Sequence, residues 1–167
     1  MTTNRRRVIG YSLFVAGILA LIGTLVALIL PGTPFIWAFE ISALALAVGF
    51  AAIGLAEDGL LRLAFAAAAV GWILIAVTSV IAGSPGIPGL VGEAIALVGG
   101  VGGGVLAWRR RLFGGSADLL FLFAMCVTGL YLLFLIIATV PAVVEAVVAI
   151  IWALDLVVVA TFILRRR

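Results

Sequence analysis

One carboxylate interrupts the last apolar run of the sequence. Asp155 lies within "IIWALDLVVV", thirteen residues into an apolar segment that starts at Ala142 and nine before its end at Leu164. At about 1.5 Å per residue, a helix carries this side chain to the middle of a bilayer. Inserting an aspartate there costs about 2.5–3.5 kcal/mol, so such a residue is expected to face a bundle interior or a wet cavity.

Four further side chains are expected near the depth of Asp155. Trp152 lies about one turn earlier on the same face, Thr128 and Tyr131 fall at similar depth on the preceding segment, and Trp72 falls on the third. A protonated Asp155 bonded to a Thr or Tyr hydroxyl group is a structural clasp between helices. A titrating Asp155 is instead an intramembrane site for a proton, a cation or a solute. The sequence leaves both interpretations open.

Three glutamates occupy equivalent places near the starts of alternate apolar segments. Glu40, Glu93 and Glu145 each follow the last proline of a turn by four to six residues. A carboxylate in the first turns of a helix is stabilised by the helix dipole by about 0.3–1 kcal/mol, and at that depth it can still reach water. The alternative is a ring of carboxylates around an outer mouth that attracts cations.

Missing residue types exclude most cofactor and catalytic chemistry. The chain has no His, no Lys and one Cys, so histidine-ligated haem, the usual zinc centres and lysine Schiff bases are not expected. No phosphate-binding loop, nucleophile pair or metal-binding motif is present. We therefore expect no cofactor and no metal, and an enzyme is the least favoured class. Cys126 lies in an apolar run, where a small buried thiol is expected.

The stretch "GGVGGG" over residues 99–104 carries two overlapping G-x-x-x-G pairs, Gly99/Gly103 and Gly100/Gly104. Such pairs let two membrane helices approach closely, and the alanine-rich run 64–69 is a matching surface. The alternative is a loosened helix that lines a cavity.

Composition identifies the elements that must position these residues. Of the 167 residues, 66% are hydrophobic and 10% are charged, and the mean hydropathy is +1.46. At roughly 20 apolar residues per bilayer crossing, the chain is an all-α integral membrane protein with one transmembrane domain, residues 1–167, and no soluble domain. Six spans are expected, at residues 8–30, 36–56, 60–82, 87–108, 119–140 and 142–164.

Charge placement predicts the orientation. With six spans, all ten arginines fall on one side and all five prolines on the other, so the positive-inside rule predicts that both termini are cytoplasmic. Short connections predict three antiparallel hairpins. The first two share a P-G-x-P turn, at residues 31–34 and 85–88, which is consistent with a helical hairpin repeat.

The sequence predicts the function only as far as two broad classes of membrane protein. Extreme apolarity and many small residues favour a structural or accessory subunit of a membrane assembly, or a protein that self-associates. The alternative is a small transporter, channel or substrate-binding subunit that uses Asp155. Besides the bilayer, anionic lipids at the arginine clusters are expected partners, and nucleic acid is not. The use of Arg without Lys suggests a GC-rich prokaryotic genome and a plasma-membrane location.

Overall fold

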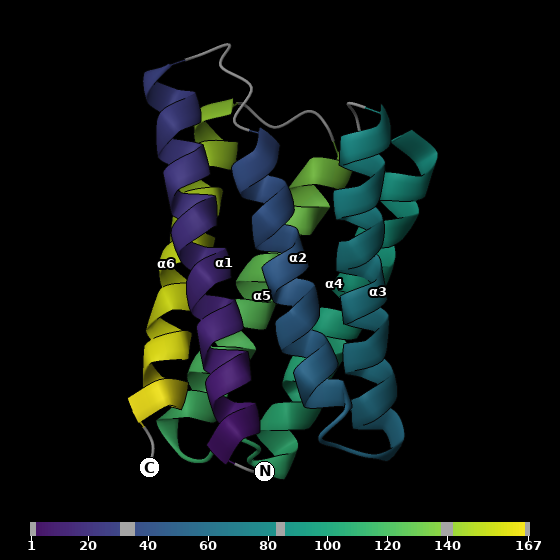
Figure 1. Cartoon of the computed structure of the whole chain (residues 1–167), viewed down its shortest axis with the longest axis vertical. Helices are drawn as coiled ribbons and strands as arrows, with labels where there is room; N and C mark the ends of the chain where they lie inside the picture. The colour runs from purple at the N-terminus through teal and green to yellow at the C-terminus, as the bar shows by residue number, and fades with distance from the viewer. Residues whose placement is uncertain (1–2, 31–35, 83–85, 138–141, 166–167) are drawn as a thin grey trace.

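The computed structural model describes residues 3–30, 36–82, 86–137 and 142–165. Over these residues the chain is helical, with no strand. The six helices stand upright side by side (Figure 1). Their bounds are α1 Thr3–Ile29, α2 Ile36–Gly54, α3 Gly59–Ala82, α4 Gly86–Arg110, α5 Ser116–Ile137 and α6 Ala142–Arg165.

Five of these helices, all except α2, are long and apolar enough to cross a membrane, and α2 contributes a shorter apolar stretch, Ala38–Gly54. Several bounds differ from expectation. Helix α1 begins at Thr3 and so includes the first arginine triplet, and α4 begins at Gly86 with Pro88 in its first turn, where proline is tolerated because its missing N–H has no partner to lose. The prolines at 31, 34, 85 and 141 lie outside the described residues.

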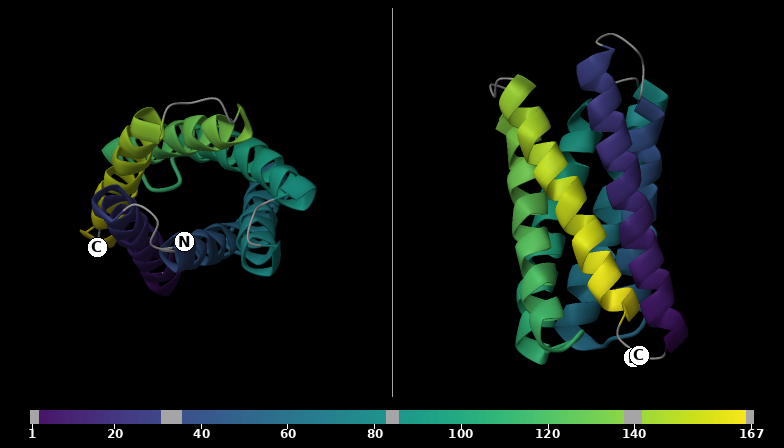
Figure 2. Two further views of the ribbon diagram at one scale, coloured as in Figure 1. Left: turned by 90° about the horizontal axis from the view of Figure 1, so that it is seen from above. Right: turned by 90° about the vertical axis from the view of Figure 1, so that its left-hand side faces the viewer.

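The helices form a closed ring, visible from above in Figure 2. Each described helix packs on its two neighbours in chain order, α6 packs on α1, and no close backbone contact joins helices that are not neighbours. Glycine residues of α1 allow it to approach α6 closely and so close the ring. A Cβ at Gly17 would lie 2.7 Å from the Ala153 carbonyl oxygen, and one at Gly10 would meet Leu164. Small residues therefore bring the first and last helices together.

Glycine also sets the approach of α3 and α4, the most extensive of the helix pairs. A Cβ at Gly71 would lie 2.5 Å from the backbone nitrogen of Ala96, and one at Gly99 would lie 2.5 Å from that of Ala68. Gly99 thus packs on the alanine-rich run of α3. Gly103 faces the Phe65 ring and Gly104 faces Met125 of α5. In contrast, a Cβ at Gly100 would only touch Met125, at 3.9 Å.

Two polar links complete the ring. The Ser42 hydroxyl of α2 donates to the Ala16 carbonyl of α1 at 2.8 Å. Between α5 and α6 the Trp152 indole donates to the Thr128 hydroxyl at 2.8 Å. Helices α5 and α6 form the least extensive of the six contacts, and no described glycine packs across it. This seam therefore depends on side chains rather than on close backbone approach.

Candidate functional site

Aromatic side chains fill the inside of the ring in the half that lies away from the chain termini. The Trp72 and Trp152 rings stack with centroids 5.9 Å apart and an interplanar angle of 6°. Tyr131 stacks on Trp152 at 4.9 Å and 12°, and Phe39 lies tilted against Tyr131 at 6.2 Å. Helix α3 lies across the helix ring from α6, and α2 lies across from α5. The Trp72–Trp152 and Phe39–Tyr131 contacts therefore join helices whose backbones do not meet. We call Phe39, Tyr131, Trp152 and Trp72 the aromatic column.

A second aromatic group fills the half of the ring nearer the chain termini. Phe50 and Phe65 stack at 5.8 Å, Phe65 contacts Phe121 at 5.9 Å, and Phe121 contacts Phe113 at 4.9 Å. The Phe65–Phe121 contact also crosses the ring, from α3 to α5. The interior of the ring is therefore packed with aromatic side chains at this end as well.

Asp155 lies beside the aromatic column but not within it. On α6 its neighbours one and two turns away, Ile151, Val158 and Phe162, are exposed, whereas Asp155 itself is 9% exposed. The side of α6 that meets α1 is formed instead by Ala153 and Val157. Asp155 is therefore covered at the margin of the α5–α6 seam, on the side of α6 that is turned away from α1.

Among the described residues, no hydroxyl group bonds Asp155, so the clasp that was one of the two interpretations is not formed. Thr128 donates to the Ala124 carbonyl at 2.7 Å and accepts the Trp152 indole N–H, so its hydrogen is already used. Asp155 Oδ2 is buried with no hydrogen-bond partner among the described residues. The structure does gather Thr128, Tyr131, Trp152 and Trp72 at one depth, as the spacing predicts, but their mutual contacts exclude Asp155.

Two of the three glutamates are buried rather than exposed to water. Glu93 is 2% and Glu40 is 4% exposed, while Glu145 is half-buried. Glu93 Oε2 and Glu40 Oε1 have no hydrogen-bond partner among the described residues. The expectation that they reach water failed because α4 starts at Gly86, which puts Glu93 two turns inside the helix, and because neighbouring helices cover both side chains.

Glu93 faces the inside of the ring. On α4, Gly92 and Gly99 face α3 and Gly104 faces α5. At 100° per residue, Glu93 projects between these two directions and opposite the exposed Val98. Glu145 lies two turns before Trp152 on α6 and therefore on the same side of that helix as the Trp152 ring.

Glu40 lies apart from Glu93. It shares a side of α2 with Gly54, where an added Cβ would contact α3 at Phe65 and Ala66. It therefore belongs to the α2–α3 contact, although its neighbour Phe39 reaches into the ring. In the alternative of a ring of three carboxylates, Glu40 therefore does not share the place of Glu93.

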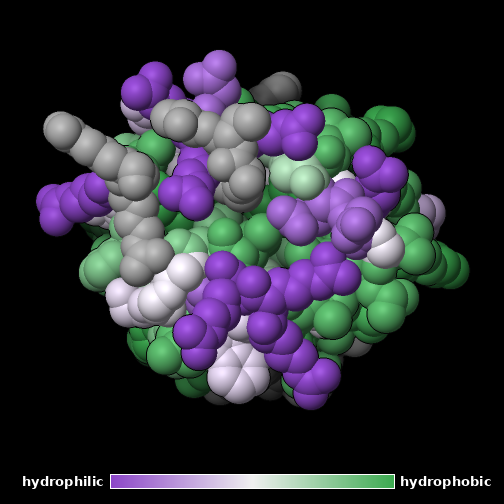
Figure 3. Space-filling view, turned by 90° about the horizontal axis from the view of Figure 1, so that it is seen from below, coloured by the Kyte–Doolittle hydropathy of each residue, from purple (hydrophilic) through white to green (hydrophobic). Residues whose placement is uncertain are grey.

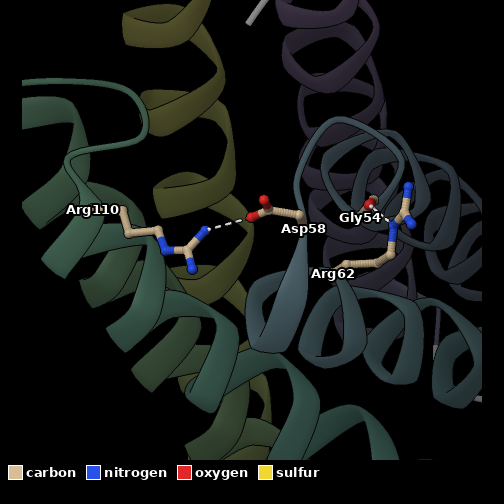
Figure 4. A network of polar contacts seen from close by, with 4 residues as sticks. All are labelled: Gly54, Asp58, Arg62 and Arg110. Atoms are coloured by element: carbon tan, nitrogen blue, oxygen red, sulfur yellow. Dashed lines mark hydrogen bonds and ion pairs between the residues drawn. The ribbon is translucent and has the colours of Figure 1, made fainter.

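Basic residues lie at the opposite end of the bundle. Figure 3 shows hydrophilic side chains gathered on the face that carries the chain termini, bordered by hydrophobic surface. Here Arg62 Nε donates to the Gly54 carbonyl at 3.4 Å and Arg5 to the Leu55 carbonyl at 3.3 Å (Figure 4 shows the former). These bonds satisfy carbonyl groups that lack helical partners at the end of α2.

The same end carries an ion pair, Arg110 to Asp58 at 3.1 Å, with both side chains exposed (Figure 4). Exposed pairs of this kind contribute about 0–1 kcal/mol. Asp118 accepts from the Phe113 backbone N–H at 2.7 Å and, with Trp108 and Arg111, borders a cavity of about 230 Å³. Arg5, Arg62 and Arg110 therefore make their contacts at this end, far from Glu93 along the helices.

Metal binding has little support in the described chain, which holds no group of three or more His, Cys, Asp or Glu side chains that could ligate an ion. Cys126 is exposed on the outer surface of α5 rather than buried as expected. Phe39 is the site residue that the sequence did not reveal, since one phenylalanine beside a turn carries no signal of which way it points.

Five helices long and apolar enough to cross a membrane indicate the class of multi-pass α-helical membrane proteins. Comparison with protein-family models, curated proteins and solved structures found no match for this chain.

Proposed function

We propose that the protein is a six-span protein of a prokaryotic plasma membrane, built as three antiparallel hairpins with both termini in the cytoplasm. Support comes from the arginines, all of which fall at chain positions that this topology puts on the cytoplasmic side. The shared P-G-x-P turns of the first two hairpins support an internal repeat. Helix α2, at 19 residues, is then the shortest span.

We propose further that the protein is a small transporter, channel or substrate-binding subunit whose interior binds a proton or a cation. One observation carries the proposal. Glu93 is buried inside the ring without a hydrogen-bond partner, and no basic residue occurs in that half of any described helix. A buried carboxylate normally has a charge partner or a proton. Because the described residues supply no partner at this depth, we propose that the partner comes from outside.

The test is proton flux in proteoliposomes loaded with a pH-sensitive dye, under an imposed pH gradient with the membrane potential clamped. We expect Glu93→Gln to lower the flux at least about tenfold, since the amide cannot carry a proton or balance a cation. Asp155→Asn should lower it less, because Asp155 lies at the edge of a seam. Glu57→Gln makes the same chemical change in the loop before α3 and serves as the control. Equal flux through the Glu93→Gln variant and the unmodified protein would contradict the proposal.

An accessory subunit is the second candidate, favoured by a groove on the outer face of α3 and α4. The groove has a volume of about 630 Å³ and is apolar. It is lined by Leu60, Leu63, Ala64, Ala67, Ala94, Ile95, Val98, Gly99, Gly102 and Leu106. A Cβ at Gly102 would meet nothing within 4 Å. Glycine inside a helix lowers stability by about 0.5–1 kcal/mol relative to alanine. Gly102 has no packing role within this chain that would offset this cost, and a helix of another subunit lying close to it would give it one.

Gly102→Leu tests this candidate. We expect the variant to fold as before, because the added side chain enters open space, and to lose any subunit that copurifies with the unmodified protein in mild detergent. Gly102→Ala, which adds one methyl group, is the matched control and should retain that subunit. The measurement is the mass of the intact particle purified from its native membrane. A particle that contains only this chain would rule the candidate out.

A further inference from the structure

We propose that the cavity between the ends of α4 and α5 binds the headgroup of a phosphatidylethanolamine lipid. The ammonium group of the lipid pairs with Asp118, and its phosphate group pairs with Arg111. This site lies at the opposite end of the bundle from Glu93, so the inference goes beyond the proposed function and does not depend on it.

The first observation is the position of the cavity at the membrane boundary. The cavity has a volume of about 230 Å³. It is lined by Trp108, Arg111, Gly115, Asp118 and Leu119. The apolar spans Ile87–Arg110 and Ser116–Leu133 end and begin here, so a bilayer that they cross has its headgroups at this level. An exposed tryptophan such as Trp108 is typical of the same level.

The second observation is an unused carboxylate oxygen in the wall of the cavity. Asp118 is 2% exposed. Its Oδ1 accepts the Phe113 backbone N–H at 2.7 Å, whereas its Oδ2 is buried with no hydrogen-bond partner in the part of the chain that the structure describes. A buried carboxylate oxygen without a partner is unfavourable, and a cationic N–H donor satisfies it best. The ligand therefore presents such a donor to Asp118.

The third observation is the arginine on the same cavity. Helix α4 ends in a Schellman motif, in which the Arg111 and Leu112 N–H groups donate to the Trp108 and Ala107 carbonyl groups, both at 3.1 Å. The motif gives Arg111 a φ of 50°. Glycine usually occupies this position because it adopts a positive φ without steric cost. Arginine therefore makes this turn less stable than glycine would, but it provides the cavity with a guanidinium group, which pairs well with phosphate.

Together, Asp118 and Arg111 require a ligand that carries both charges. They form no ion pair with each other in the described chain. Asp118 would repel a phosphate that came alone, and Arg111 would repel an amine that came alone. A phosphoethanolamine group carries a phosphate and an ammonium ion on one short chain, so it can pair with both. Phosphocholine has the same charges, but its quaternary nitrogen has no hydrogen to donate to Oδ2.

The outer surface of α5 supplies a place for the acyl chains. Leu119 borders the cavity, and Leu119, Phe123, Leu130 and Leu133 are all exposed. At 100° per residue these four side chains point within about 40° of one direction. They form an apolar strip that starts at the cavity and runs along the span. A lipid whose headgroup occupies the cavity can therefore lay its acyl chains on α5, which favours a membrane lipid over a free phosphoethanolamine compound.

The experiment is native mass spectrometry of the full-length protein in mild detergent, titrated with lipids that share the same two oleoyl chains. Phosphatidylethanolamine is the test lipid. Phosphatidylcholine is the matched control without an N–H donor, and phosphatidylglycerol is the control without a cation. We expect phosphatidylethanolamine to bind at least about tenfold more tightly than either control, because it alone satisfies both side chains.

Two pairs of variants test the two side chains. Asp118→Asn keeps an oxygen for the Phe113 N–H but loses the charge, so it should remove the preference for phosphatidylethanolamine over phosphatidylcholine. Asp58→Asn makes the same change at an exposed aspartate of the same end and should keep the preference. Arg111→Gln should weaken the binding of both lipids by about fivefold, because both carry the phosphate. Arg109→Gln, which alters an arginine that does not line the cavity, is its control.

Arg111→Gly separates lipid binding from a structural role of the arginine. Glycine adopts the positive φ without steric cost, so this variant should melt at the same temperature as the unmodified protein or higher, and yet bind phosphatidylethanolamine about fivefold more weakly. Gel filtration checks that every variant is folded.

Four results would overturn the inference. Two are equal binding of phosphatidylethanolamine and phosphatidylcholine, and an unchanged preference in Asp118→Asn. The third is unchanged lipid binding in Arg111→Gly. The fourth is tighter binding of phosphatidylglycerol, which would favour an anionic lipid instead. Glycerophosphoethanolamine, which has the headgroup without acyl chains, should not displace the bound lipid at equal concentration, and displacement would overturn the membrane lipid as the source of the headgroup.

Discussion

Gly71→Ala is expected to disrupt the packing of α3 on α4 and to lower the stability of the whole ring. The added methyl group would lie 2.5 Å from the Ala96 backbone nitrogen, 2.6 Å from the Gly92 carbonyl oxygen and 2.8 Å from the Ala96 Cα. All three atoms belong to backbone, so no side chain can turn away and the helices must separate. Overpacking of this kind costs about 1–3 kcal/mol, and occasionally more.

Gly99→Ala should have a similar effect from the other helix, since its Cβ would lie 2.5 Å from the Ala68 nitrogen and 2.7 Å from the Ala64 carbonyl oxygen. Gly102→Ala is the control. It makes the same substitution in the same glycine run but enters open space, so stability should stay the same or rise by up to about 1 kcal/mol. The measurement is the temperature at which the monodisperse peak is lost in gel filtration. If all three variants melted together, close packing of α3 and α4 would be disproved.

Trp152→Ala is expected to be the most destabilising single change inside the ring. The indole is fully buried, stacks on both Tyr131 and Trp72, and bonds Thr128 across the α5–α6 seam. Removing a buried aromatic side chain costs about 3–5 kcal/mol in soluble cores. The cost persists in a bilayer because the cavity loses packing contacts whatever surrounds the protein.

Trp152→Phe separates the two contributions. It keeps a ring in the column and loses the hydrogen bond to Thr128, which is worth about 0.6 kcal/mol on average between membrane helices. Trp108→Ala is the control for loss of an indole, because Trp108 is 43% exposed near the end of α4. Chemical unfolding in detergent, followed by circular dichroism, should rank Trp152→Ala far below the other two. Comparable stability of Trp152→Ala and Trp108→Ala would show that the aromatic column does not contribute to the stability of the fold.

The elements of the fold could be predicted closely because each is a local property. A run of about twenty apolar residues between turn signals is a helix in a bilayer wherever it ends up, and the expected segment 60–82 matches α3, Gly59–Ala82, within one residue. Helix ends were less certain. Helix α1 extends over Arg5, Arg6 and Arg7, which have good helix propensity although they are polar.

Side-chain direction was harder to predict. A soluble helix shows which side is inside by its polar residues, but here both sides are apolar, so the pattern that separates interior from exterior is weak. Cys126 was expected to be buried and is exposed for this reason. Glycine is a partial exception, because a small residue marks a close approach. Even so, the run 99–104 mixes glycines that pack tightly, such as Gly99, with Gly102, which faces open space.

The sequence by itself determined that the chain is an apolar helical protein, which segments are helices, which end collects the arginines, and which polar residues share a depth. Each of these depends on composition and on distance along a helix. Only the tertiary structure decided that the helices close into a ring, that Trp72 meets Trp152 across it, and that Glu93 faces the inside while Asp155 and Glu40 lie in seams. Those outcomes depend on how each helix is rotated about its own axis, and that rotation is set by contacts between residues far apart in the chain, such as Gly17 with Ala153 and Gly71 with Ala96.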